Sequence, residues 1–196
     1  MNGTSPWFLQ EIDGTIRTSG QVPKLLFPGS YRPLHGGHRL LAEVAGRKLG
    51  LSVTFEISRT NVDKPPLADF EVAERLKQFE NYAPVAVTRA AIFTDKARLF
   101  PGCVFIAGAD TACRIVDPKY YGNDPAKRDS ALEELFESGN TFLIAGRCDA
   151  NERFIELNGI EIPARYRELF TGLSEAEFRA DLSSTAIRNL QGETNR

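Results

Sequence analysis

Short runs of apolar residues alternate along the chain with longer segments in which apolar residues recur every three or four positions. The short runs lie at 25–27, 53–57, 85–87, 103–107 and 141–145. A run of this length fits a buried strand, whereas the longer segments between the runs fit helices with one apolar face. From residue 24 onward, the chain therefore predicts five strands that alternate with helices.

Strands that alternate with helices predict one parallel sheet with helices on both faces. The run at 103–107 contains no polar residue, as expected of a strand that is covered on both sides. The fold class that we predict is α/β, with a Rossmann-like, doubly wound, five-stranded parallel sheet in three α/β/α layers. In such sheets ligands bind at the carboxyl ends of the strands, where the strand order reverses.

The length of 196 residues and a hydrophobic content of 42% suit one domain with one core. We predict that this domain spans 24–196. Residues 1–23 contain two short apolar stretches on either side of Asp13 and Gly14, a pair that favours a tight turn. This segment is expected to form an edge hairpin or an arm. The range 151–180 is ambiguous, with a helix expected at 164–170.

Charge and cysteine content narrow the classes of function. The formal net charge is −2, so the chain has no basic excess to neutralise the phosphates of a nucleic acid or an anionic membrane. Cys103, Cys113 and Cys148 lack the spacing of metal ligands and fit reduced thiols. No stretch has the pattern of a secretory signal or the length of a membrane span. We expect a cytoplasmic protein with small-molecule partners and no nucleic-acid or membrane partner, and a homo-oligomer is left open.

A glycine-rich turn follows the first predicted strand and leads into a helix, with the sequence GSYRPLHGGH at 29–38. A helix start has unpaired N–H groups and partial positive charge, so an anion can bind there when glycines leave room. His35 and His38, the only histidines of the chain, are three residues apart and can face the same anion as hydrogen-bond donors. The alternative is a pair of surface or capping histidines.

A second helix start is predicted near the end of the chain, at LSSTAIR in positions 182–188. Ser183 or Ser184 can cap this helix, and Thr185 adds a further hydroxyl. Arg188 lies one turn further on, where its guanidinium can hold two phosphate oxygens. Two helix starts, two histidines and this arginine together suit a triphosphate. The alternative is an ordinary capped terminal helix with a surface arginine.

The two segments resemble the two sequence motifs of the nucleotidylyltransferase superfamily. GSYRPLHGGH is similar to its phosphate-binding motif, in which His-x-Gly-His follows Gly-Ser-Phe-x-Pro, and LSSTAIR is similar to its second motif, Ile-Ser-Ser-Thr-x-Ile-Arg. From about Leu25 onward the chain resembles in particular the nicotinamide-nucleotide adenylyltransferase branch, and an uncharacterised cytidylyltransferase-like relative that is sometimes joined to a CinA-like domain. Arg32 departs from the pattern, because relatives have Asn or Asp there, and Tyr31 replaces Phe.

The resemblance implies an enzyme of NAD biosynthesis that moves AMP from ATP onto a phosphorylated acceptor such as nicotinamide mononucleotide and releases pyrophosphate. It implies that His35, His38 and Arg188 are catalytic and stabilise the transferring phosphates. Mg²⁺ is expected to bridge the phosphates of the nucleotide, since the sequence holds no evident carboxylate cluster for it. The alternatives are a CTP-dependent cytidylyltransferase acting on an alcohol phosphate, and a catalytically silent nucleotide-binding module.

The other candidate residues form two groups. The nucleotide-binding candidates are Gly29, Ser30, Tyr31, Gly37, Gly108, Asp110, Arg147, Ser183, Ser184 and Thr185. By the resemblance, Asp110 accepts hydrogen bonds from the ribose hydroxyls, and the alternative is that it caps a helix. The loop after the second predicted strand faces the same sheet edge, so the acceptor-binding candidates are Asn61, Lys64 and Arg75, with Arg32 beside the phosphates. Solvated surface side chains are the alternative for this second group.

Overall fold

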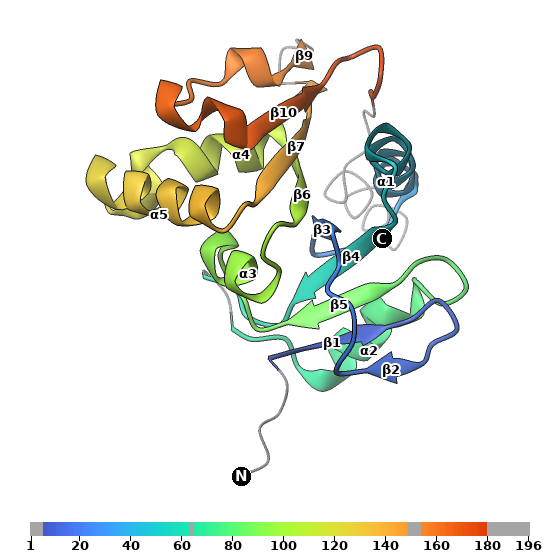
Figure 1. The fold of residues 1–196 in the computed structure, drawn as a ribbon. Helices are drawn as coiled ribbons and strands as arrows, with labels where there is room; N and C mark the ends of the chain where they lie inside the picture. Colours follow the sequence, from blue (N-terminus) through green and yellow to red (C-terminus); the bar gives the residue numbers. More distant parts are fainter. Residues whose placement is uncertain (1–5, 63–64, 149–153, 180–196) are drawn as a thin grey trace, which may run out of the picture.

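The structure is a computed structural model that describes residues 6–62, 65–148 and 154–179. An eight-stranded sheet runs through the molecule in the order β10-β7-β6-β3-β4-β5-β1-β2, and helices lie on both sides of it (Figure 1). The strands of this sheet are β1 (Trp7–Gln10), β2 (Ile16–Arg17), β3 (Leu25–Pro28), β4 (Val53–Ser58), β5 (Val85–Thr88), β6 (Val104–Gly108), β7 (Thr141–Ala145) and β10 (Phe170–Leu173).

The connections between the strands are mostly helical. The helices are α1 (Gly36–Leu49), α2 (Asp69–Lys77), α3 (Phe93–Leu99), α4 (Ala109–Val116) and α5 (Pro125–Glu137), with 3₁₀ helices η1 (Pro118–Tyr121), η2 (Leu157–Gly159) and η3 (Ala164–Leu169). A separate two-stranded ladder is formed by β8 (Arg147–Cys148) and β9 (Phe154–Ile155). Several helix ends carry the expected signals, for example Asp124, whose side chain accepts two backbone N–H groups at the start of α5.

Six neighbouring strands, from β10 to β5, are parallel. From β3 the chain adds β4 and β5 on one side, and then β6, β7 and β10 on the other, so the strand order reverses between β3 and β6. The pairing of these two strands ends at Leu26 and Phe105, although β3 runs on to Pro28 along β4 and β6 runs on to Gly108 along β7. The carboxyl edge of the sheet is therefore unpaired between β3 and β6.

Two apolar clusters lie on the two faces of the sheet. Successive strand residues point to opposite faces, so that Leu25 and Phe27 join the cluster under α1 and α2, whereas Leu26 joins the one under α3, α4 and α5. The same alternation separates Phe105 from Ile106 in β6. Helices bury both faces of the sheet, and this gives the molecule its three layers. Because the six neighbouring strands from β10 to β5 are parallel, the connections that follow them all start at the same edge of the sheet.

The N-terminal segment extends the sheet as a hairpin. β1 pairs antiparallel with β5 from Trp7 to Gln10, and its other side pairs with β2. The ring of Trp7 lies 5.4 Å from the ring of Phe100, so the hairpin packs on the core as well as on the edge strand. Within the predicted segment 1–23, the structure has a hairpin at residues 7–17, next to the edge strand β5 of the parallel sheet.

All five predicted strands are present within a residue of their expected bounds. The prediction of a five-stranded parallel sheet is wrong, because β10 adds a sixth parallel strand and the hairpin adds two antiparallel ones. The sequence of β10, FTGL, is short and contains a glycine, so its pattern does not predict a strand. The helix expected at 164–170 is the 3₁₀ helix η3, which leads directly into β10.

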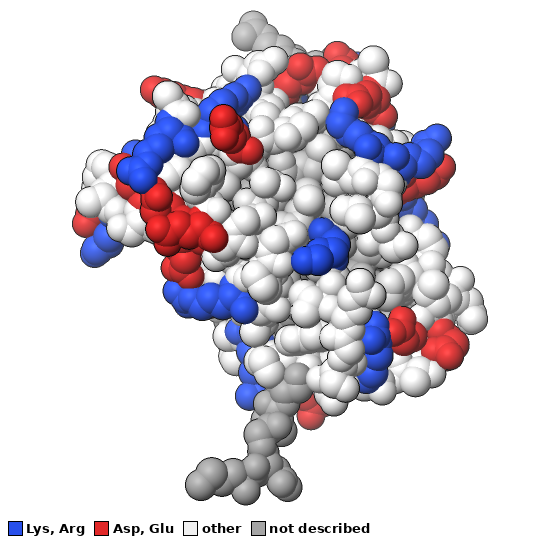
Figure 2. Space-filling model, viewed as in Figure 1, with Lys and Arg blue, Asp and Glu red and all other residues white. Residues whose placement is uncertain are grey.

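The surface seen in Figure 2 carries basic and acidic side chains next to one another, with no broad area of one sign. This mixture agrees with the formal net charge of −2. In the parts of the chain that the structure describes, no helix has both the length and the apolar character needed to cross a membrane.

Candidate functional site

Tyr31 shapes the turn between β3 and α1, because its side chain packs against Gly29, the first residue of the turn. Tyr31 has a φ of 45°, in the left-handed region, and its hydroxyl donates a hydrogen bond to the C=O of Phe27. A Cβ atom on Gly29 would lie 2.5 Å from the ring carbon Cζ of Tyr31. Position 29 therefore requires glycine while the tyrosine is in this place. Tyr31 itself is buried in the core, so its ring supports the turn from below.

The turn ends at His35, which is the N-cap of α1, and His38 follows in the first turn of that helix. Their rings stack with 3.7 Å between centroids and 25° between planes. The backbone N–H of His35 donates to Nδ1 of His38 at 3.3 Å. A neutral imidazole nitrogen that accepts a hydrogen bond carries no proton, so we assign the proton of His38 to Nε2. His38 thus has one N–H donor that this contact does not use.

Both imidazoles are neutral at neutral pH. Burial lowers the pKa of His35, and burial together with repulsion from His35 lowers the pKa of His38 to about 4. Nδ1 of His35 is buried and has no hydrogen-bond partner within the described residues. The His35 side chain faces the backbone N–H of His38 in capping-box geometry, so this nitrogen is directed at the helix start.

Aromatic rings below His38 fix its position. Its ring centroid lies 5.0 Å from that of Tyr31 and 6.0 Å from that of Phe27, both in edge-to-face geometry. Tyr31 packs in turn on Phe55 and Phe79, with centroids 5.3 Å and 5.2 Å away. Such contacts stabilise a defined ring orientation. The imidazole of His38 therefore packs on the core through the rings of Tyr31 and Phe27.

Two predicted acceptor-binding residues come together next to this turn. Arg32 and Arg75 line, with Phe70, a cavity of about 500 Å³ between the turn and α2. Nη1 of Arg75 donates to the C=O of Ser30 at 3.0 Å. Burial lowers the pKa of Arg75, and the positive charge of Arg32 lowers it further. The negative charge of Glu71 opposes these effects but does not cancel them. Ser30, expected at the nucleotide, is therefore held through its backbone by a residue expected at the acceptor.

The carboxyl ends of β6 and β7 bring together two predicted nucleotide-binding residues. Arg147, the first residue of β8 and two residues after the end of β7, forms an exposed ion pair with Asp110 in the first turn of α4. Asp110 does not cap the helix, since the N-cap is Gly108. A Cβ atom on Gly108, or on Gly36 at the start of α1, would meet no atom of another described part of the chain within 4 Å. Both helix starts are therefore open to an approaching group.

The remaining candidates are divided between described and undescribed parts of the chain. Gly37 is buried in the first turn of α1, and Asn61 is an exposed residue of the loop after β4. Arg188, Ser183, Ser184, Thr185 and Lys64 lie outside the described residues. The convergence of the two motifs on one anion stays a prediction.

A buried ion pair behind the turn is not predicted from the sequence. Nζ of Lys96 lies 2.9 Å from both carboxylate oxygens of Glu56 and 2.7 Å from the C=O of Ala90, and Thr88 donates its hydroxyl to the same carboxylate at 2.6 Å. The C=O of Glu56 accepts the N–H of Gly29 at 2.9 Å. The one signal in the sequence is a glutamate within the apolar strand β4, which marks a buried charge that needs a partner.

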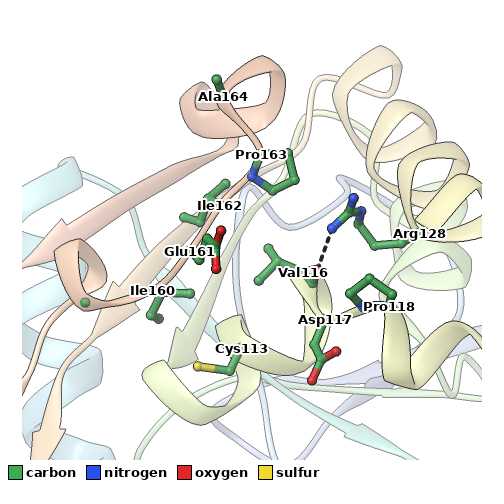
Figure 3. Close-up of a pocket in the computed structure, with 11 residues that line it drawn as sticks. Cys113, Val116, Asp117, Pro118, Arg128, Ile160, Glu161, Ile162, Pro163 and Ala164 are labelled. Atoms are coloured by element: carbon green, nitrogen blue, oxygen red, sulfur yellow. Dashed lines mark hydrogen bonds between the residues drawn. The ribbon is translucent and has the colours of Figure 1, made fainter. Parts of the chain in front are cut away.

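Another cavity, of about 690 Å³, lies between α4, η1, α5 and the segment 159–164 (Figure 3). Arg128 faces this cavity, but its Nη1 donates to the C=O of Val116 at 3.0 Å and its Nε to Asp129 at 2.6 Å. The charge of this arginine is thus compensated by the protein. The cavity is lined by none of the predicted site residues.

In the described ranges, no group of three or more His, Cys, Asp or Glu side chains could hold a metal ion. The sequence matches no model of a known protein family and no curated protein. The chemistry of the site must therefore be inferred from the turn, the histidine pair and the two open helix starts.

Proposed function

We propose that this protein is a nucleotidylyltransferase that transfers AMP from ATP to a phosphorylated acceptor such as nicotinamide mononucleotide and releases pyrophosphate. The observation that carries the proposal is the stacked, neutral pair His35 and His38 at the start of α1. Their rings bring N–H donors to a helix N-terminus, where an anion is already favoured.

The position of the pair in the sheet gives further support. The histidines follow β3, and the strand order reverses between β3 and β6. The order of the six parallel strands is that of doubly wound, Rossmann-like sheets, in which ligands bind at this reversal. In the proposal the adenosine part of ATP extends toward Gly108, with Asp110 and Arg147 near the ribose and the base.

In the proposed reaction, a phosphate oxygen of the acceptor attacks the α-phosphorus of ATP. The new P–O bond forms as the bond to the β-phosphate breaks, and pyrophosphate leaves with that electron pair. The acceptor phosphate is already ionised, so no side chain has to remove a proton. His35 and His38 donate hydrogen bonds to oxygens on which charge grows, and this stabilises the transition state over the ground state.

Residues near the end of the chain complete the proposal. Ser183, Ser184 and Thr185 would supply hydroxyl and N–H donors to the phosphates, and Arg188 would supply a guanidinium. Mg²⁺ would neutralise phosphate charge as part of the bound nucleotide, because the described residues contain no cluster that would hold it. Arg32, Arg75, Asn61 and Lys64 would contact the acceptor.

The test is pyrophosphate release with ATP or CTP against a panel of phosphorylated acceptors that includes nicotinamide mononucleotide and glycerol phosphate. His38→Ala should lower kcat at least about 100-fold, since one lost donor removes about 2.7–4 kcal/mol of transition-state stabilisation. The control is Arg47→Ala, in the last turn of the same helix, where the guanidinium lies 3.4 Å from Glu43 in an exposed pair. This variant should keep full activity.

The outcomes of this test separate the candidate functions. Turnover with CTP and an alcohol phosphate alone would identify a cytidylyltransferase in place of an adenylyltransferase. Nucleotide binding without turnover of any pair would indicate a binding module. If the folded protein binds neither nucleotide, the proposal is wrong.

A further inference from the structure

Two side chains hold the turn that leads to the histidines, one from α2 and one from the C-cap residue of that helix. Gln78, the C-cap of α2, accepts the N–H of Leu34 on Oε1 at 2.8 Å and donates from Nε2 to the C=O of Tyr31 at 3.0 Å. Arg75, three residues earlier, donates to the C=O of Ser30 at 3.0 Å. Residues three apart on a helix share one face, so both side chains reach the turn from the same side.

The side chains of Arg75 and Gln78 bind backbone groups of three residues of the turn. Among the described residues, Ser30, Tyr31 and Leu34 make no backbone-to-backbone hydrogen bond. The first such bond before the turn is from Gly29 to the C=O of Glu56, and those after it are accepted by the C=O of His35 at the start of α1. The backbone groups of Ser30, Tyr31 and Leu34 are thus bound by the side chains of Arg75 and Gln78, and the ring of Tyr31 is buried in the core.

The helix that provides these side chains is itself firmly placed. Val72 and Leu76 of α2 are buried in the core, and so is Phe79 directly after Gln78. Gln10 of β1 also donates from Nε2 to the C=O of Leu76 at 3.2 Å. A support of this kind fixes the turn with respect to the sheet.

We propose that Gln78 and Arg75 are positioning residues, which set the stacked geometry of His35 and His38 by fixing the turn that leads into α1. Leu34, bound by Gln78, is the residue directly before His35. A shift of Leu34 would move the N–H of His35, and that N–H is the donor to Nδ1 of His38. The histidine pair is thus linked to α2 in three steps: the hydrogen bond of Gln78 with Leu34, the backbone from Leu34 to His35, and the hydrogen bond of His35 with His38. The importance of this link for catalysis rests on the proposed function, but the link itself does not.

The experiment measures the imidazole signals of the full chain by NMR in Gln78→Met and Gln10→Met. Methionine has the shape of glutamine without its hydrogen bonds, and both glutamines donate to α2 carbonyls, but only Gln78 contacts the turn. In Gln78→Met we expect the pKa of His38 to rise from about 4 by at least about one unit, because a looser turn admits water to the ring. The Leu34 amide signal should shift as well. Gln10→Met should leave both signals unchanged.

Gln78→Asn provides a milder, uncharged variant in case Gln78→Met does not fold. The asparagine retains the amide donor and acceptor but is one methylene shorter, so weaker hydrogen bonds to the turn and a smaller change in the same direction are expected. Unchanged histidine pKa values and an unchanged Leu34 amide in a folded Gln78 variant would overturn the proposal. These measurements need neither nucleotide nor turnover, so they remain decisive if the proposed activity is absent. If the enzyme is active, kcat of Gln78→Met should fall at least about tenfold more than the affinity for ATP, since the donors are misaligned.

Discussion

The imidazoles of His35 and His38 stack with 3.7 Å between centroids, so a positive charge on one ring disfavours a positive charge on the other. Burial already disfavours the charged form of both rings, and this repulsion adds to the effect on His38. The pair is therefore a set of neutral donors in the free protein. An anionic ligand would reverse the balance, because negative charge favours protonated imidazole.

The free energy of unfolding should fall as the pH is lowered from 7 to 4. In the folded protein the pKa of His38 is about 4, compared with the ordinary value of 6.5 in an unfolded chain. Between these values the unfolded chain binds a proton that the folded chain does not, so stability is complete above pH 6.5 and decreases toward pH 4. The contribution of this one group is up to about 3 kcal/mol. Urea unfolding at a series of pH values measures it.

The matched variant for this measurement is His38→Gln, which cannot titrate. As the pH falls, the free energy of unfolding should decrease more for the wild type than for this variant, because only the wild type has the His38 imidazole. Parallel curves from pH 7 to 4 would contradict the assigned pKa.

Binding of ATP should raise the pKa of His38. We expect a rise of at least about one unit, since phosphate charge near the ring stabilises the imidazolium form. Titration of the imidazole NMR signals with and without ATP measures this change, and adenosine, which lacks the phosphates, is the control ligand. If ATP binds and the histidine pKa stays at about 4, the phosphates lie elsewhere.

Two glycine-to-alanine substitutions should separate stability from function. Gly29→Ala places a methyl group 2.5 Å from the Tyr31 ring, so it should destabilise the protein by about 1–3 kcal/mol. The methyl group of Gly36→Ala meets no other part of the chain within 4 Å among the residues that the structure describes, so this variant should be more stable by up to about 1 kcal/mol. The second methyl group lies at the helix start where the phosphates are proposed to bind. It should weaken ATP binding at least about tenfold.

Thermal unfolding and ATP titration of the two variants provide the measurements. Gly36→Ala with normal ATP affinity would exclude a phosphate close to this backbone position. Gly29→Ala with normal stability would show that Tyr31 moves away without loss.

Removal of the ammonium group of Lys96 should be strongly destabilising. Its side chain is 5% exposed and that of Glu56 is 1% exposed, so Lys96→Met leaves a buried carboxylate without its cation. A loss of about 3–5 kcal/mol is expected, and the double variant with Glu56→Gln should recover part of it. The control is Lys77→Met at the exposed pair with Glu74, which should leave the urea midpoint unchanged. A double variant no more stable than Lys96→Met alone would argue against this account.

The strands of the parallel core could be predicted because each is a compact apolar run between helical segments. β10 could not, since Gly172 and Thr171 interrupt its apolar pattern and its pairing with β7 is a long-range contact. The place of β1 in the sheet is similar: Asp13 and Gly14 indicate the hairpin, but nothing local selects β5 as the neighbour of β1. Local sequence indicates an element, whereas the partner depends on the whole fold.

The candidate site shows the same division. The motif around His35 and His38 predicts a turn into a helix, and the structure has that turn, with the rings stacked. It does not predict that Tyr31 is buried below them or that Gln78 holds the turn from α2. Gln78 lies more than forty residues away in sequence, and an amide side chain carries no signal for its hydrogen-bond partners.

The hairpin at the end of the sheet has a consequence for how molecules of this protein meet. Without it, β5 would present an open row of N–H and C=O groups, an arrangement that recruits strands from other chains into fibrils. β1 covers that row, and the outermost strand, β2, has only two residues, one of them the charged Arg17. Loss of this segment, by proteolysis or truncation, should leave a protein that precipitates at concentrations where the intact chain stays dispersed.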